Sequence, residues 1–324
     1  MKKIKLIILL PILIIILSGC LNYIELNDIG IIDVICIAKD EKNYFVSINM
    51  LNPSIKDEKK ERKNYKVDAP TIEQAFDKLY LLTAKSINLS HLELLILSPN
   101  LSKNDYNSIK DFFLNRNDSR NTFSVVILEN YNNDNLFKFD HKEINSLINT
   151  NHIDDGIVCT KTFDQIMEDI LNLSISYIPT ISISDKIEIL GYRAVYSESK
   201  LLSIKESITY NFLTNKILKA NLIDENLNLK IDKSVTTTSI NKNNIEININ
   251  STITDYSKNK NISKTYNNLI KSYILEFLKN NNTNYFTQLI KKYNYSYYKK
   301  NKNIKPKFKV NVTSKVNEEA KENE

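Results

Sequence analysis

The sequence predicts an α+β fold, in which mixed sheets with packed helices form an N-terminal region and a strand-rich C-terminal domain contains one long helix. Two observations indicate this class. In the first half, short apolar runs of strand character alternate with stretches of helical periodicity. In the second half, several strand-like runs precede a long amphipathic stretch at residues 265–280. The chain has 324 residues, of which 42% are hydrophobic, and this is enough for two domains with separate cores.

The first half opens with two apolar runs, 29–38 and 44–51, whose polar turn predicts a β-hairpin. Thr71 and Gln74 have the spacing of a capping box, so we expect a helix to begin there. The elements expected next are a helix at 71–82, a strand at 92–97, a helix at 105–115, a strand at 122–128 and a helix at 162–171. The remaining charged or polar stretches are expected to be loops, at 54–66 and 130–155.

The second half begins after Pro179, and we place the main domain boundary near residue 188. A second hairpin is expected from 190–196 and 201–204. Further strands are expected at 219–224, 227–231, 235–240, 245–256 and 307–312, and helices at 265–280 and 285–293. The long helix is expected to bury one stripe of large side chains, namely Leu269, Ile270, Tyr273, Ile274, Phe277 and Leu278. The resulting domains are 20–188, with a further division near residue 130 left open, and 189–316, followed by a charged tail at 317–324 expected to be disordered.

Residues 1–19 have the pattern of a bacterial lipoprotein signal peptide. A basic start precedes an unbroken apolar run from Leu6 to Leu17. This run is shorter than the roughly 20 residues that a membrane-spanning helix needs. Leu17-Ser18-Gly19-Cys20 then matches a lipobox, in which the Cys20 thiol receives a diacylglycerol before cleavage. We therefore expect a mature chain that starts at Cys20 and is anchored by its lipid to the outer face of the cytoplasmic membrane. The alternative is an uncleaved anchor with an incidental cysteine.

Composition and charge exclude several classes of protein. Four glycines leave no place for the Gly-rich loops that bind nucleotide phosphates. Half of the net charge of +6 comes from three lysines in the leader, so little positive charge remains for binding nucleic acid. Cys36 and Cys159 lie in apolar contexts that predict buried thiols, and a disulfide between them is left open.

The sequence indicates no catalytic residue, no metal and no cofactor. His91, His141 and His152 lack histidine or cysteine partners at metal-ligand spacing. No nucleophile motif of a hydrolase is present. Asp154 and Asp155 are adjacent acids in an expected loop, where carboxylates are usually solvated.

Two sets of residues are candidates for contacts. Arg116 and Arg120 stand four apart in a chain whose basic residues are nearly all lysine. A planar guanidinium suits a bidentate contact, so we expect the pair to pin a helix end, with a partner-facing pair as the alternative. Residues 293–298 hold four tyrosines beside lysines. Such a patch suits either a half-buried edge or contact with an anionic membrane surface.

Taken in order, these residues resemble the Ger(x)C family, the C-subunit lipoproteins of GerA-type spore nutrient germinant receptors. After the lipobox, Glu25-Leu26-Asn27-Asp28 matches the family's opening motif, although the family's preceding Trp and Asp are absent. Further matches follow in the family's order at Asn52-Pro53, His91-Leu92-Glu93, residues 116–120, Pro179 and the segment Gly191-Tyr192-Arg193-Ala194-Val195-Tyr196. The stretch 281–305 is shorter than in the family and lacks its Trp.

The resemblance implies a non-enzymatic subunit that forms a complex with two integral-membrane proteins, the A and B subunits, in the spore inner membrane. Nutrients bound by such complexes trigger the release of ions and dipicolinate, and the lipoprotein would support assembly or signal transfer. Arg116, Arg120, Asn27 and Asp28 are then candidate structural or partner contacts. The rival is a solute-binding lipoprotein of an ABC importer, which would usually have two similar α/β lobes.

Overall fold

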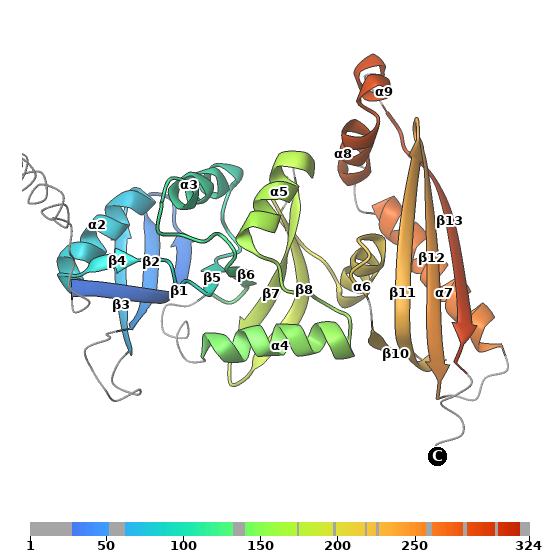
Figure 1. Ribbon diagram of the computed structural model, residues 1–324, viewed down its shortest axis with the longest axis horizontal. Helices are drawn as coiled ribbons and strands as arrows, with labels where there is room; N and C mark the ends of the chain where they lie inside the picture. Colours follow the sequence, from blue (N-terminus) through green and yellow to red (C-terminus); the bar gives the residue numbers. More distant parts are fainter. Residues whose placement is uncertain are drawn as a thin grey trace, which may run out of the picture.

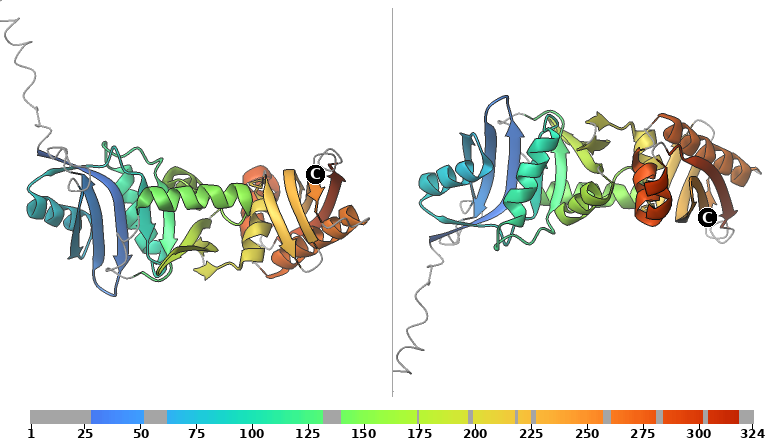
Figure 2. Two further views of the ribbon diagram at one scale, coloured as in Figure 1. Left: turned by 90° about the horizontal axis from the view of Figure 1, so that it is seen from below. Right: turned by 90° about the horizontal axis from the view of Figure 1, so that it is seen from above.

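The computed structural model describes residues 28–51, 62–131, 140–173, 175–196, 199–217, 219–224, 227–256, 261–280, 284–301 and 304–317. Within them the chain forms two sheets, A and B, with helices packed on both (Figure 1). Figure 2 shows the two sheets following each other along the long axis of the molecule. The predicted α+β class is confirmed.

Sheet A contains nine of the described strands in the order β3-β2-β1-β5-β6-β7-β8-β9, with β4 beside β1. The strands are β1 (Ile29–Lys39), β2 (Tyr44–Leu51), β3 (Arg62–Ala69), β4 (Ser86–Asn88), β5 (Leu94–Leu97), β6 (Ser124–Leu128), β7 (Ser176–Ile183), β8 (Ile187–Val195) and β9 (Lys200–Leu201). The central strands β1, β5, β6 and β7 run parallel, whereas both sides of the sheet are antiparallel. The predicted first hairpin is confirmed as β1 and β2.

Helices cover both faces of sheet A. One face carries α2 (Ile72–Thr83), α3 (Lys103–Leu114) and α5 (Phe163–Leu173), and the other carries α4 (His141–Asp154) and α6 (Ile204–Leu213). Because successive side chains of a strand point to opposite faces, β1 contributes to both cores. Ile35 and Ile37 join the first cluster, whereas Val34 and Cys36 join the second. The parallel strands are therefore buried on both faces, as their continuous apolar runs require.

Sheet B has the order β10-β11-β12-β13 and supports the C-terminal helices. Its elements are β10 (Ala220–Asp224), β11 (Leu227–Asn241), β12 (Asn244–Asp255), α7 (Ile262–Asn280), α8 (Asn284–Tyr293), α9 (Tyr295–Lys300) and β13 (Lys307–Val316). The alternating Ile245, Ile247 and Ile249 of β12 are buried against α7, as the period of two predicts. The strands expected at 227–231 and 235–240 are one strand, β11, with an irregularity between Ile231 and Lys233.

Two expected loops contain regular structure. The expectation of a loop at 54–66 is wrong for its described part, since residues from Arg62 onward form edge strand β3, whose mostly exposed side chains explain its charged sequence. The expectation of irregular structure at 130–155 is wrong for α4. This helix buries a narrow stripe that includes Ile144 and Ile148, and so narrow a stripe leaves a weak periodic signal in a polar sequence.

The region between the sheets also differs from expectation. Pro179 lies inside β7 and pairs with Tyr192, and sheet A continues across residue 188 into β8 and β9. The chain passes from sheet A to sheet B between β9 and β10. The connection is α6, which begins at Ile204, so the expected hairpin strand at 201–204 is wrong for its last residue.

Helix α6 packs closely against β8. Gly191 has a φ of +120°, and a Cβ there would lie 2.5 Å from Ser207 Oγ and 2.9 Å from the Leu202 carbonyl oxygen. A glycine is therefore required where β8 bends against α6. The Ser207 hydroxyl in turn accepts a hydrogen bond from the backbone N–H of Tyr192 over 3.0 Å.

Candidate functional site

Two of the candidate residues, Cys20 and Asn27, lie outside the described residues, as do the expected signal peptide and all but residue 317 of the expected tail. Asp28 is described. It is exposed and directly precedes β1. The structure therefore places one of the three N-terminal candidates, at the start of sheet A.

Arg116 fixes the segment after α3 against β4. Its Nε and Nη2 donate to the two carboxylate oxygens of Asp118 over 2.8 and 2.7 Å, and Nη2 also donates to the Ile87 carbonyl oxygen over 3.2 Å. The Asp118 carboxylate accepts a further bond from the Leu89 N–H. Although burial opposes ionisation, these donors hold the pKa of Asp118 below its usual value. Arg116 thus makes the bidentate contact that a helix-end anchor requires.

Arg120 does not join this contact. It is exposed, and no ion pair links it to a carboxylate among the described residues. Arg116 and Arg120, which stand four residues apart in the sequence, therefore do not share a contact in the described structure. Arg116 serves a structural contact, and the Arg120 guanidinium is left accessible to another protein.

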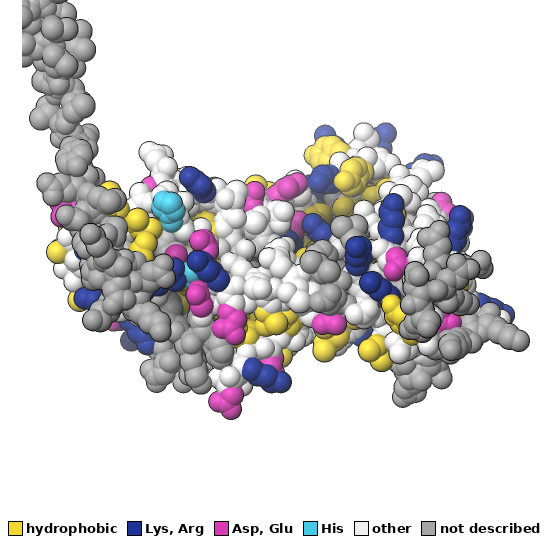
Figure 3. Space-filling view, turned by 60° about the horizontal axis from the view of Figure 1, so that its bottom comes forward, with side chains coloured by type: hydrophobic (Ala, Val, Ile, Leu, Met, Phe, Trp, Pro, Cys, Tyr) yellow, Lys and Arg dark blue, Asp and Glu magenta, His cyan; other side chains and the backbone are white. Residues whose placement is uncertain are grey.

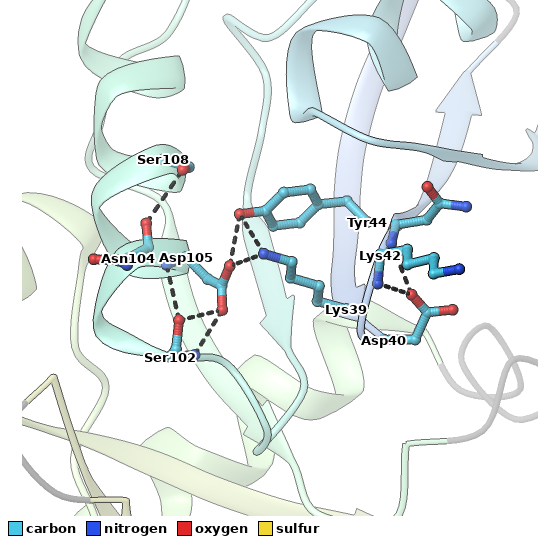
Figure 4. Close-up of polar contacts among 9 residues, drawn as sticks. Lys39, Asp40, Lys42, Tyr44, Ser102, Asn104, Asp105 and Ser108 are labelled. Atoms are coloured by element: carbon cyan, nitrogen blue, oxygen red, sulfur yellow. Dashed lines mark hydrogen bonds and ion pairs between the residues drawn. The ribbon is translucent and has the colours of Figure 1, made fainter.

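Asp105 collects hydrogen bonds from three parts of the chain (Figure 4). Its Oδ1 accepts from Lys39 Nζ over 2.5 Å and from the Tyr44 hydroxyl over 2.7 Å. Its Oδ2 accepts from the N–H and the hydroxyl of Ser102 over 2.8 and 2.6 Å. Burial raises the pKa of Asp105, but these donors outweigh it and hold the pKa at about 2. One carboxylate thus caps α3 and ties it to the β1–β2 hairpin, which is a structural role.

A second charged cluster surrounds His141 at the start of α4. Its Nε2 lies 2.9 Å from Glu93 Oε2 and its Nδ1 lies 2.9 Å from Asp140 Oδ1. Asp33 Oδ2 lies 3.9 Å from Nδ1 and 3.2 Å from Arg62 Nη1. The pKa of Asp33 is raised, because the effect of burial outweighs the opposing effects of Arg62 and His141. The sequence did not indicate this cluster, because its members come from four separate segments and share no local spacing.

The cluster joins α4 to sheet A through close contacts between acidic side chains and His141 or Arg62. Carboxylate oxygens thus lie within hydrogen-bonding distance of both ring nitrogens of His141. No group of histidine, cysteine and acidic residues suited to a metal ion occurs in the part of the chain that the structure describes. The geometry is that of a structural contact between α4 and sheet A.

A groove of about 690 Å³ lies where α5 and α6 approach sheet B and α8. This volume is in the range of small-molecule sites. Its wall combines polar side chains, such as Asn215 and Thr236, with apolar ones, such as Leu289, and the exposed Lys292 stands at its edge. Asp169, which also lines the groove, is ion-paired with Lys161. The arrangement offers polar and apolar contacts to a ligand or a peptide.

Two further observations concern the cysteine thiols and the length and hydropathy of the helices. Cys36 and Cys159 are both buried and free, so they do not form a disulfide, and burial raises the pKa of each thiol. Among the residues that the structure describes, no helix is both long and apolar enough to cross a bilayer.

Comparison with known proteins gives two matches. A family model described as the spore germination protein N-terminal domain matches residues 22–183, half of the chain. A solved structure titled "Crystal Structure of the GerBC protein" matches with a TM-score of 0.53 and 15% identity, over 87% of this chain and 96% of that chain. A search of curated proteins finds no match. The solved structure shows a shared fold that extends over both sheets.

Proposed function

We propose that this chain, which belongs to the Ger(x)C family of spore germination proteins, is the lipid-anchored C subunit of a spore germinant receptor. It takes part in receptor assembly and in nutrient-triggered germination without catalysing a reaction. The family match over residues 22–183 carries the proposal. The fold shared with GerBC supports it across the rest of the chain.

The partners in this proposal are the integral-membrane A and B subunits. The exposed Arg120 is a suitable contact, because its guanidinium has no carboxylate partner among the described residues and is free to bind one on another subunit. Co-purification from spore membranes tests this assignment. Deletion of the gene that encodes this chain should abolish germination through its receptor. It should also lower the amounts of the A and B subunits recovered from spore membranes.

Arg120→Glu provides a sharper test. It should reduce recovery of the A and B subunits while leaving the melting temperature of the protein unchanged, since an exposed side chain without partners contributes little to stability. Arg116→Lys is the matched control, because it should lower the melting temperature through loss of the Asp118 contact. Unchanged recovery with Arg120→Glu would exclude Arg120 as a partner contact, and normal germination without the chain would contradict the function itself.

The anchor in this proposal is a diacylglycerol on Cys20 that holds the protein on the outer face of the spore inner membrane. The lipobox Leu17-Ser18-Gly19-Cys20 after a short apolar run supports it. Cys20→Ala should leave an unprocessed precursor that incorporates no radiolabelled palmitate. Incorporation that survives the substitution would contradict lipidation at this residue.

A solute-binding role remains the rival, and the groove between α5 and α8 is where a solute would bind. The two sheet regions differ in strand number and order, which does not match the two similar lobes expected of an importer protein. Calorimetry with amino acids, sugars and nucleosides on the isolated protein separates the two functions. Tight binding by the protein alone would favour the importer.

A further inference from the structure

Positive charge is concentrated near the C-terminal end of the chain. Residues 277–317 contain ten lysines and no aspartate or glutamate. The net charge of the whole chain is +6, so the rest of the sequence has an excess of acidic residues. This asymmetry is a feature of the sequence that neither the fold nor the proposed function explains.

Helices α8 and α9 present part of this charge at a projecting tip. Figure 1 shows α8 beside the upper part of sheet B and α9 extending beyond it, and Figure 3 shows hydrophobic side chains beside lysine or arginine over the half of the molecule that holds sheet B. Phe286 and Ile290 are buried and attach α8 to the core of sheet B. Tyr293 and Tyr295 are instead 66% and 59% exposed. We call the exposed residues Lys291, Lys292, Tyr293, Tyr295, Lys299 and Lys300 the α8–α9 tip.

The charges of the tip are not neutralised within the described part of the protein. None of its four lysines forms an ion pair with a carboxylate there. Two of them lie near aromatic rings, with Lys291 Nζ 5.8 Å from the Tyr298 ring centroid and Lys292 Nζ 5.7 Å from that of Tyr293. The tip therefore combines uncompensated positive charge with exposed tyrosine rings, and its Lys292 and Tyr293 also border the groove described above.

This combination suits a lipid bilayer. Clusters of four or more lysines bind anionic lipid headgroups, and tyrosine prefers the boundary between headgroups and hydrocarbon, because its ring is apolar and its hydroxyl is polar. A projecting tip also reaches a flat surface without rearrangement of the core. We propose that the α8–α9 tip docks on the surface of an anionic bilayer.

The proposed contact is separate from the lipid anchor. The described chain enters β1 at one end of the molecule, whereas α8 and α9 lie beside sheet B in the other half (Figures 1 and 2). Two separate attachments would fix the orientation of the protein on the membrane, which a single anchor does not do.

Vesicle binding by residues 21–324, which lack the lipid, tests the docking alone. Every residue of the three hydrophobic clusters lies at Ile32 or later, so this chain retains each described core. It should co-sediment with vesicles of phosphatidylglycerol and phosphatidylcholine and not with phosphatidylcholine alone, and added salt should release it. Lys291→Gln with Lys292→Gln should weaken binding about 25-fold, at roughly fivefold per lysine. Lys63→Gln with Lys142→Gln, which removes the same charge from exposed sites in β3 and α4, is the matched control and should change binding less than twofold.

Fluorescence locates the contact, because the chain has no tryptophan. Tyr295→Trp should show a blue-shifted emission when anionic vesicles are added, as the indole enters the interface. Tyr80→Trp is the control, since Tyr80 on α2 is similarly exposed, at 54%, and lies far from the tip.

The proposal would be overturned by a lack of binding to anionic vesicles, by equal loss of binding in the two lysine double variants, or by equal blue shifts at both tryptophans. Binding to an acidic protein in place of vesicles would assign the tip to a protein partner and also overturn it. None of these results would affect the receptor function, which is tested by germination and by co-purification.

Discussion

At the scale of single residues, Arg116 shows why an arginine persists in a lysine-rich chain. Its guanidinium bonds both oxygens of Asp118 and the Ile87 carbonyl, and an ammonium group cannot reproduce this planar fork. Arg116→Lys should destabilise the protein by about 1–2 kcal/mol in denaturant unfolding. Arg120→Lys, at an exposed site, should change it by less than about 0.5 kcal/mol. Equal effects of the two substitutions would contradict this assignment.

Asp105 gives the protein a defined acid sensitivity. Its carboxyl group has a pKa of about 2 in the folded protein, against an ordinary value of 3.8. A depressed folded pKa stabilises the fold above the unfolded pKa, and this stabilisation is lost as the pH falls from about 4 toward 2. Asp105→Asn should therefore remove about 2 kcal/mol at pH 6 and flatten the dependence of stability on pH below 4. Urea unfolding at several pH values measures both, with the exposed Asp111→Asn as the control. A slope retained in Asp105→Asn would assign the acid sensitivity to other groups.

Asp105 also shows which contacts a local sequence pattern can predict and which it cannot. Ser102 and Asp105 have capping-box spacing, so the cap of α3 was within reach of a local pattern. The contact with Lys39 spans 66 positions, and the His141 cluster unites four segments. No local spacing encodes such contacts, because the sheet topology alone brings these residues together.

At the scale of elements, patterns succeeded where one face is apolar and the other polar. The hairpin β1–β2, the helix α3 and the long helix α7 follow from their periodicity. Helix α6 did not, because it is buried on several sides and its buried set includes the polar Ser207, Thr209 and Asn211. Those side chains form hydrogen bonds with backbone groups, and a helix that buries them has no continuous apolar stripe by which its sequence could predict it.

Helix α7 allows a comparison between adjacent residues. Ile274 is fully buried against sheet B, whereas Leu275 is 45% exposed. Ile274→Ala should cost about 2–5 kcal/mol, because it removes buried methyl groups and leaves a cavity. Leu275→Ala should cost less than about 1 kcal/mol. Thermal melts of the two variants measure the difference. Similar losses would mean that α7 presents a different face to the sheet.

At the scale of the whole molecule, the two sheets are joined by helices that belong to both. Within α6, Tyr210 packs in the second cluster of sheet A and Phe212 packs in the cluster of sheet B. Helix α7 does the same, since Phe277 lies in the second cluster while the neighbouring Leu278 lies in that of sheet B. Lys205 of α6 also pairs with Glu276 of α7 over 2.6 Å. The sequence could not show this sharing, because a single stripe on α7 was expected to cover one sheet.

Phe277 therefore couples the stabilities of the two sheets. The unaltered protein should unfold in one calorimetric transition, since the shared helices make either region less stable without the other. Phe277→Ala should weaken the contact between α7 and sheet A more than it weakens the core of either sheet. The sheet B region should therefore melt at a lower temperature, and the single transition should split in two. Differential scanning calorimetry measures the split through the ratio of calorimetric to van't Hoff enthalpy, which should rise above one. Lys279→Ala, an exposed position on the same turn of α7, should leave a single transition at an unchanged temperature. A Phe277→Ala protein that melts in one transition, merely shifted downward, would show that Phe277 stabilises the molecule as a whole and that the coupling passes through α6 instead.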